Sequence, residues 1–173
     1  MAPAHMRSLT ATRPVLLPDN SDRALRKLLY DLFTVGAQLE EIRRRVGARI
    51  DLTGPQFTIM TAIAELEGSK GVSVGRVAKH LHVAQSFITV ESRKLAQKGY
   101  IGKEPDEQDR RVSRLRISRK GRSVLNSLTP LLQQINDVAF ELKSRRQFET
   151  LCTVFEGLVG SSRRALALAG GKV

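Results

Sequence analysis

The stretch Ser73–Ile101, SVGRVAKHLHVAQSFITVESRKLAQKGYI, decides the fold because two short helical patterns meet within it. In the first pattern, a serine that can cap a helix precedes apolar residues at helical spacing: Val74, Val77, Ala78 and Leu81. A tight connection at His82–Val83 leads to a second pattern over 84–98, and Gly99 stands where a left-handed C-cap favours glycine. Two short helices joined by such a turn predict a helix-turn-helix.

A β-hairpin is predicted directly after this motif. The segment 100–104 contains Tyr and Ile, and the segment 112–117 alternates apolar with polar residues at strand period. The proline and the charged residues between them, over 105–111, are typical of a turn. A hairpin that follows a helix-turn-helix is a wing, so the centre of the chain is predicted to be a winged helix-turn-helix.

Helical patterns surround the winged module. One is expected just before it, where Thr53 can cap a helix that ends near Gly68. Longer amphipathic patterns cover 22–46, 124–142 (with a kink expected at the proline within it) and 146–159. Their apolar stripes are too long for the small module to cover, and a second copy of the same chain is the simplest partner. We therefore expect a mainly α protein with a small β-wing that forms a homodimer.

Positive charge is concentrated in the winged module. The chain has 29 Lys and Arg against 17 Asp and Glu, a net charge of +12. Residues 70–122 hold 14 of the basic and 5 of the acidic side chains, a net charge of +9 in less than a third of the chain. Such a cluster indicates a surface that meets a polyanion, and beside a helix-turn-helix the expected partner is double-stranded DNA.

The sequence contains few residues that would indicate a redox, metal-binding, enzymatic or membrane function. Cys152 is the only cysteine, so no disulfide within the chain is possible, and we expect a small core thiol, with a redox switch as the alternative. His80 and His82 point apart, and no nucleophile stands with a base at recognisable spacing, so neither a metal, a cofactor nor an enzyme is expected. No apolar run approaches the roughly 18 residues of a membrane span or a secretory signal, which favours a cytoplasmic protein.

The second helix of the pair is the one expected to read bases. One outward face and its flanks carry Ser86, Phe87, Thr89, Val90, Arg93 and Lys94. Arg93 can fork onto guanine, and Val90 or Phe87 can touch a thymine methyl group. The alternative, a face that is merely solvated, is disfavoured by its place between a helix-turn and a basic hairpin.

The hairpin supplies a second set of candidates. Asp109 can direct Arg110 or Arg111 by a charge-assisted hydrogen bond, and an arginine at a hairpin tip reaches a narrow minor groove. Arg114 and Arg116 share one face of the returning strand, where they can follow the phosphates, and we expect the same of Lys103 on the first strand. The alternative is a solvated turn with a local salt bridge of little energetic weight.

These features together resemble the MarR family of bacterial transcription regulators, from about Asp22 to Val159. The wing DEQDRRVSRLRISRKG is similar to the family's Asp-x-Arg hairpin, with the Asp and Arg at Asp109 and Arg111. DLTGPQFTIM resembles the entry into the family's second helix, and LHVAQSFITVESRKLAQKGYI resembles its recognition helix. The chain departs from the family pattern at a few places: Ala84 in place of a capping residue, Val90 in place of a frequent arginine, and Glu91 and Ser92 in place of apolar residues.

The resemblance implies a homodimer that binds a pseudo-palindromic operator, usually as a repressor, and that releases DNA when a small aromatic or phenolic effector binds. The pocket for such an effector would draw on Tyr30, Phe33 and Phe57, although plain core packing is an equal alternative for each. The alternative function is a dimeric protein-interaction module without sequence-specific DNA binding. A third is a small-molecule binder or an enzyme with no DNA role, and the absence of a catalytic constellation argues against the enzyme.

The expected organisation has four parts. They are a mobile N-terminal tail (1–21), a helical dimerisation region (22–50 and 118–165), a winged helix-turn-helix DNA-binding domain (51–117) and a C-terminal tail (166–173). The effector, the operator, the regulated genes and the direction of regulation are left open by the residues.

Overall fold

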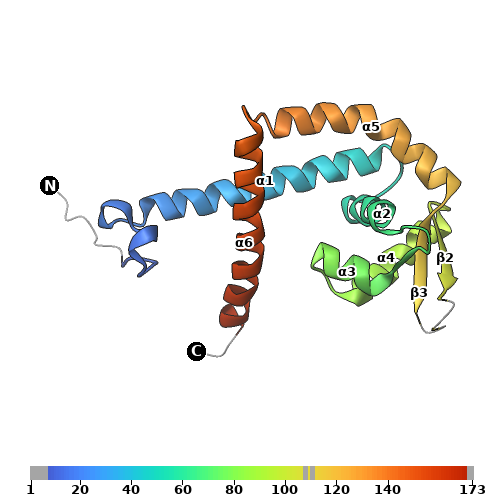
Figure 1. Ribbon diagram of the computed structural model, residues 1–173, viewed down its shortest axis with the longest axis horizontal. Helices are drawn as coiled ribbons and strands as arrows, with labels where there is room; N and C mark the ends of the chain where they lie inside the picture. Colours follow the sequence, from blue (N-terminus) through green and yellow to red (C-terminus); the bar gives the residue numbers. More distant parts are fainter. Residues whose placement is uncertain (1–7, 107–108, 110–111, 171–173) are drawn as a thin grey trace. The chain divides into compact units, whose positions relative to one another are not determined.

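The computed structural model describes residues 8–106, 109 and 112–170 (Figure 1). Within them, two 3-10 turns (Pro14–Leu16 and Pro18–Asn20) precede α1 (Arg23–Ala48), α2 (Gly54–Leu66), β1 (Val72–Ser73), α3 (Val74–Leu81), α4 (Gln85–Gln97), β2 (Ile101–Pro105), β3 (Ser113–Ile117), α5 (Arg119–Ala139) and α6 (Arg145–Ala169). The chain separates into two compact units, residues 1–126 and residues 127–173. The predicted class, mainly helical with a small wing, is confirmed.

The predicted helix after Thr53 is present as α2, and a reciprocal cap closes its first turn. The Gln56 backbone N–H donates to Thr53 Oγ1 at 3.3 Å, and the Thr53 N–H donates to Gln56 Oε1 at 3.3 Å. Both bonds satisfy donors that a helix start leaves without partners. The helix lies at the centre of the core, whose most deeply buried apolar side chains are Ile59, Met60, Ile63, Val72, Val77, Ile88, Leu95 and Leu115.

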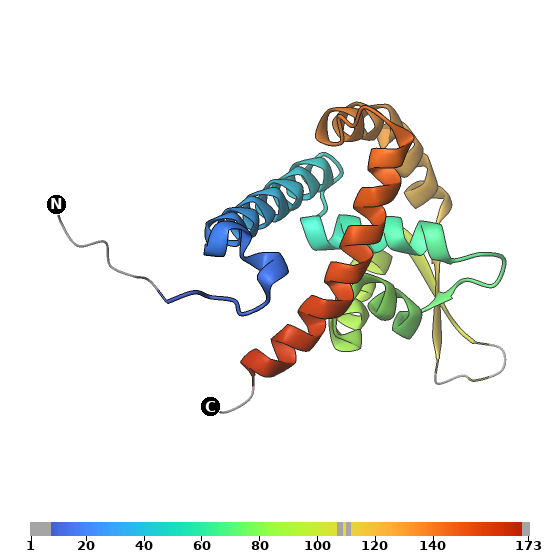
Figure 2. The same ribbon diagram turned by 60° about the vertical axis from the view of Figure 1, so that its left-hand side comes forward.

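The wing is a three-stranded antiparallel sheet with the strand order β1-β3-β2. Figure 2 shows β2 and β3 side by side next to the short helices. Leu115 in the central strand pairs with Val72 on one side and with Lys103 on the other. The sequence predicts the two hairpin strands but not β1, because a strand of two residues has no pattern of its own and forms by pairing with β3.

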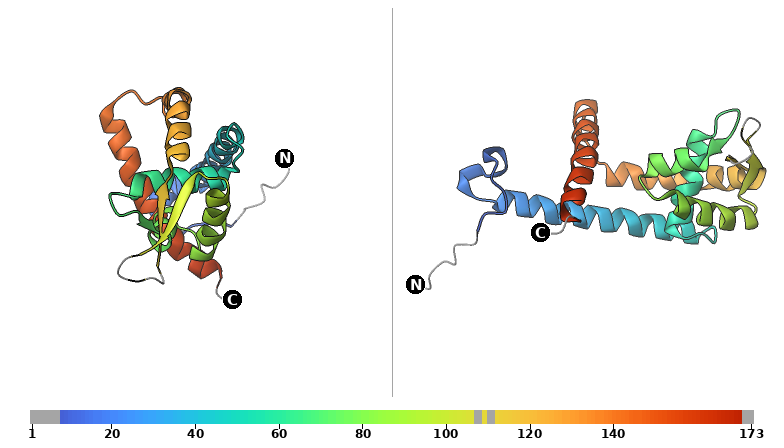
Figure 3. Two further views of the ribbon diagram at one scale, coloured as in Figure 1. Left: turned by 90° about the vertical axis from the view of Figure 1, so that its right-hand side faces the viewer. Right: turned by 90° about the horizontal axis from the view of Figure 1, so that it is seen from below.

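The first long helix, α1, leads into α2 through a short loop and buries little of its own surface (Figure 3). Near its start, the backbone N–H and the hydroxyl of Thr10 both donate to Asp22 Oδ2, at 3.0 and 2.7 Å, and Asp22 is buried. Part of the segment expected to be a free tail is therefore fastened to the beginning of α1. The bond from the Thr10 hydroxyl is the main reason why the pKa of Asp22 lies below its usual value.

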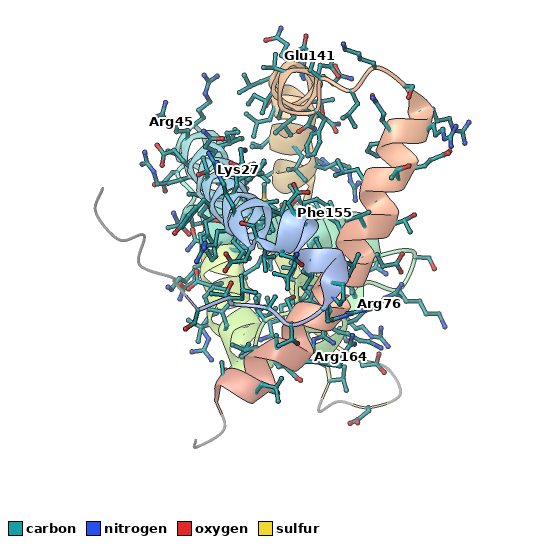
Figure 4. The ribbon with its side chains drawn as sticks, turned by 90° about the vertical axis from the view of Figure 1, so that its left-hand side faces the viewer. Lys27, Arg45, Arg76, Glu141, Phe155 and Arg164 are labelled. Atoms are coloured by element: carbon teal, nitrogen blue, oxygen red, sulfur yellow. The ribbon has the colours of Figure 1, made fainter. Side chains whose placement is uncertain are left out.

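The second unit consists of the later part of α5 and of α6. The helix α5 continues through Pro130, and α6 extends to Ala169, beyond Val159, the last apolar position of the predicted helical pattern. Phe155 and Arg164 both lie along α6 (Figure 4). Cys152 is exposed in the single chain. The expectation that it is a buried core thiol is therefore wrong for a single chain.

Candidate nucleic-acid interface

The helix-turn-helix forms as predicted. Ser73 caps α3 by accepting a hydrogen bond from the Arg76 backbone N–H at 3.2 Å. His82 ends α3 in a left-handed conformation (φ 56°), and the chain turns there toward α4. The N-cap of α4 is Ala84, which makes no side-chain hydrogen bond to the helix, as expected for alanine. Gly99 ends the second helix at a φ of 75°, a conformation that favours glycine.

The recognition helix α4 divides cleanly into a buried and an exposed side. Its inward side chains are Ile88, Glu91, Ser92 and Leu95. The candidate DNA contacts Ser86, Phe87, Val90, Arg93 and Lys94 are all exposed, and the structure brings them together on the outward side. Thr89 lies between the two sides, and its hydroxyl donates to the Gln85 carbonyl at 3.0 Å.

The unexpected acid at Glu91 has a specific polar environment. Its side chain is 8% exposed and accepts hydrogen bonds from Gln56 Nε2 at 2.9 Å and from Lys94 Nζ at 2.7 Å. Since Gln56 also belongs to the cap of α2, this contact fastens the middle of the recognition helix to the first turn of α2. The ion pair with Glu91 also gives Lys94, a predicted DNA contact, a partner within the protein.

The end of α4 has a second anchor. Lys98 Nζ lies 2.9 Å from Asp51 Oδ2, and the Tyr100 hydroxyl donates to the Ile50 carbonyl at 2.8 Å. Both contacts hold the end of the recognition helix to the loop that joins α1 to α2. Sequence reasoning missed them because each connects residues about 50 positions apart.

The register of the wing separates its basic residues onto two faces. Arg114 pairs with Glu104 and Arg116 pairs with Gly102, so both arginines lie on one face, as predicted. Lys103 pairs with Leu115, whose side chain is buried, so Lys103 lies on the face opposite the two arginines. Lys103 is nevertheless exposed, because it stands on the edge strand. Lys103 and the two arginines therefore cannot follow one line of phosphates together.

Asp106, which was not a candidate, organises the described part of the wing loop. Its carboxylate accepts from Arg114 Nε and from the Asp109 backbone N–H, the latter at 3.1 Å. Arg116 donates to the Ser69 carbonyl, so both strand arginines have contacts within the protein. The hairpin-tip residues Arg110 and Arg111 lie outside the described residues, and their pairing with Asp109 stays a prediction.

The three aromatic candidates for an effector pocket lie in different environments. Tyr30 and Phe33 are 66% and 70% exposed on α1, whereas Phe57 is 5% exposed in the core of the winged module. Phe57 therefore has the packing role that was its alternative, and the effector pocket stays a prediction.

Comparison with known proteins supports the same module. The model of the MarR family matches residues 52–113, from the loop before α2 to the start of β3. Over these residues, which make up about a third of the chain, the chain is similar to the MarR family. This match to the winged module indicates a DNA-binding transcription regulator of the MarR type.

Two curated transcription regulators are similar to this chain in sequence. The uncharacterised HTH-type transcriptional regulator YpoP of Bacillus subtilis is 27% identical over 135 residues, which cover 76% of this chain and 94% of YpoP. The transcriptional activatory protein BadR of Rhodopseudomonas palustris is 28% identical over 98 residues, covering 57% of this chain. The match spans only 56% of the length of BadR.

The fold of this chain is similar to that of solved MarR structures. A mutant of MarR from E. coli, crystallised in complex with operator DNA, superposes with a TM-score of 0.66 at 16% identity, over 78% of this chain and 95% of that one. At this identity the likeness shows the shared fold. Among the residues described, no helix has the length and hydropathy needed to cross a membrane.

Proposed function

We propose that this protein regulates transcription as a homodimer that binds a pseudo-palindromic operator. Each α4 would lie in a major groove, with the two helices one helical turn of DNA apart, and each wing would enter a flanking minor groove. The observation that carries the proposal is the exposed set Ser86, Phe87, Val90, Arg93 and Lys94 on a helix that is anchored at its middle and its end.

Charge supports duplex DNA as the partner. The segment 70–122, which contains this helix, has a net charge of +9, and Arg93 is exposed on the outward side of the helix. Exposed arginine can bind guanine through two parallel hydrogen bonds. Such a contact distinguishes one base from another, whereas contacts with phosphates do not. The structure of E. coli MarR with operator DNA supplies a precedent for this fold.

The uncovered apolar side chains support the homodimer. Large apolar side chains between 39% and 82% exposed occur along α1 and the second unit: Leu28, Leu29, Tyr30, Phe33, Val35, Val138, Phe140, Leu142, Phe148, Val154, Phe155, Leu158, Val159, Leu166 and Leu168. Large apolar side chains that are exposed repeatedly along a helix indicate an interaction surface. A second copy offers the same surface and the symmetry that a pseudo-palindrome requires.

The direction of regulation and the effector are finer parts of the proposal. We propose a cytoplasmic repressor that is released by a small aromatic or phenolic ligand, as the family resemblance implies. The relative BadR is named an activatory protein. The level of the neighbouring gene's transcript after deletion of this protein therefore distinguishes repression from activation. A rise in that transcript after deletion supports repression, and a fall indicates activation.

Selection of bound fragments from random and genomic DNA tests the function. The recovered fragments should share a pseudo-palindrome, and the affinity should fall steeply as the salt concentration rises, because bound phosphates release counterions. Arg93→Ala should change the preferred sequence, whereas Arg111→Ala should weaken binding with little change in preference. If no duplex is retained at low ionic strength, the protein-interaction module becomes the better account.

A further inference from the structure

The outward side of the recognition helix carries two apolar side chains that are neighbours. Val90 is 49% exposed and Phe87 is 39% exposed, and residues three apart are neighbours on a helix surface. Ser86 and Arg93 are also exposed, and they precede and follow this pair along the helix. The surface proposed to face a groove of DNA thus includes two apolar side chains among its polar ones.

Several polar groups of the same helix are occupied within the protein. The Thr89 hydroxyl donates to the Gln85 carbonyl at 3.0 Å, and the hydroxyl of the buried Ser92 donates to the Thr89 carbonyl at 3.2 Å. Glu91 faces Gln56 and Lys94, as described above. The hydroxyl groups of Thr89 and Ser92 and the carboxylate of Glu91 are therefore engaged within the protein. Contact with base edges is left to the exposed side chains of the helix, which include Phe87 and Val90.

Only one of the four bases presents an apolar group in the major groove. Thymine carries a C5 methyl group there, whereas the other bases present donors and acceptors. An apolar side chain against those polar edges would remove water from them without replacing the hydrogen bonds, which is unfavourable. Against a thymine methyl group, the same side chain buries apolar surface and leaves no polar group without a partner.

We propose that Phe87 and Val90 determine specificity by contacting thymine C5 methyl groups in each operator half-site. This inference rests on the proposed function and specifies what the site recognises. The exposed Arg93 and Lys94 on the same helix, and the net charge of +9 over residues 70–122, favour the duplex major groove over a second protein surface as the occupant.

Replacement of thymine by deoxyuridine tests the inference, because it removes the methyl group and keeps the hydrogen-bonding edge. Each thymine of a selected half-site is replaced in turn, and affinity is measured by fluorescence anisotropy. The wild-type protein should bind about fourfold more weakly for each contacted thymine, the value expected for one buried methyl group. Binding that is unchanged at every position overturns the inference while the proposed function stands.

Variants of similar shape assign the effect to these side chains. Val90→Thr exchanges one methyl group for a hydroxyl at an exposed position, and should remove the sensitivity to deoxyuridine at one thymine. Phe87→Ser should do so at another. Val15→Thr, at a 76% exposed valine in the N-terminal segment, should keep the wild-type sensitivity.

The remaining outcomes are also decisive. An equal loss in the wild type and in both recognition-helix variants would mean that the methyl group acts through the shape of the duplex, and would overturn the inference. Failure of the wild-type protein to bind any thymine-containing duplex at low salt would overturn the proposed function itself, and the inference with it.

Discussion

Glu91 is the single residue that most constrains the seating of the recognition helix. A buried carboxylate is stable only when hydrogen bonds or an opposite charge replace its water. Here the amide of Gln56 supplies one replacement and the ammonium group of Lys94 supplies another. Because the contact reaches α2, it fixes α4 by a directional bond in addition to the apolar contacts of Ile88 and Leu95.

Gln56→Leu should destabilise the protein, since it removes a donor from a buried charge and half of the α2 cap. The expected loss in the free energy of unfolding is about 1–3 kcal/mol, the cost of an unsatisfied buried group. Urea denaturation of the wild type and the variant measures it. Gln97→Leu, at an exposed position in the last turn of α4, is the control and should change little. Equal losses in both variants would contradict this role.

The same site predicts a dependence on pH. Burial raises the pKa of Glu91, but the hydrogen bonds from Lys94 and Gln56 together hold it below its usual value of 4.5. The ionised form is thus favoured in the folded state, and its contribution is complete above pH 4.5 and is lost as the pH falls through the lower folded value. The difference in unfolding free energy between the wild type and Glu91→Gln should therefore shrink below that pH. A difference that grows with acidity would refute the assignment.

At the scale of elements, the junction between the wing and α5 is the tightest contact. Ser118 caps α5 by accepting from the Gly121 N–H at 2.9 Å, and a side chain at Gly121 would overlap the Tyr100 carbonyl oxygen. The same carbonyl accepts from the Ser118 N–H at 3.0 Å, so it cannot move away freely. This close approach joins the start of β2 to the start of α5.

Gly121→Ala should destabilise the winged module by about 1–3 kcal/mol through overpacking, despite the better helix propensity of alanine. Gly75→Ala in α3 is the matched control, since its added carbon would lie 3.5 Å from Gln85 Oε1, an ordinary contact. That variant should be neutral or more stable by up to about 1 kcal/mol. Thermal unfolding followed by circular dichroism compares them, and the reverse order would contradict the packing described.

Local signals in the sequence predict the elements well, and contacts between distant segments escape them. Thr53, Ser73 and Gly99 act as caps because each signal lies within a few residues of the helix that it bounds. By contrast, β1 forms only beside β3, and the bond between Gln56 and Glu91 spans 35 positions. For the interface, the exposed face of α4 follows from helical period, whereas the partners of Lys94 and Arg114 depend on how the elements pack.

At the scale of the whole molecule, the exposed apolar side chains are the basis of the proposed homodimer. Phe155 on α6 is 42% exposed, and no residue of α6 is buried in the described chain. Phe155→Glu places a charge on this surface and should give a monomer with greatly reduced operator affinity, because two linked heads bind more tightly than one. Light scattering and anisotropy measure both effects. Ser162→Glu, at an exposed polar position, should remain dimeric, and a dimeric Phe155→Glu variant would place the interface elsewhere.

The mass of the complex with a selected full-length operator, determined by light scattering after gel filtration, tests the central claim most directly. Two chains on one duplex, together with a markedly weaker complex on an isolated half-site, is the predicted result. One chain per duplex, or no complex at low ionic strength, would contradict the account.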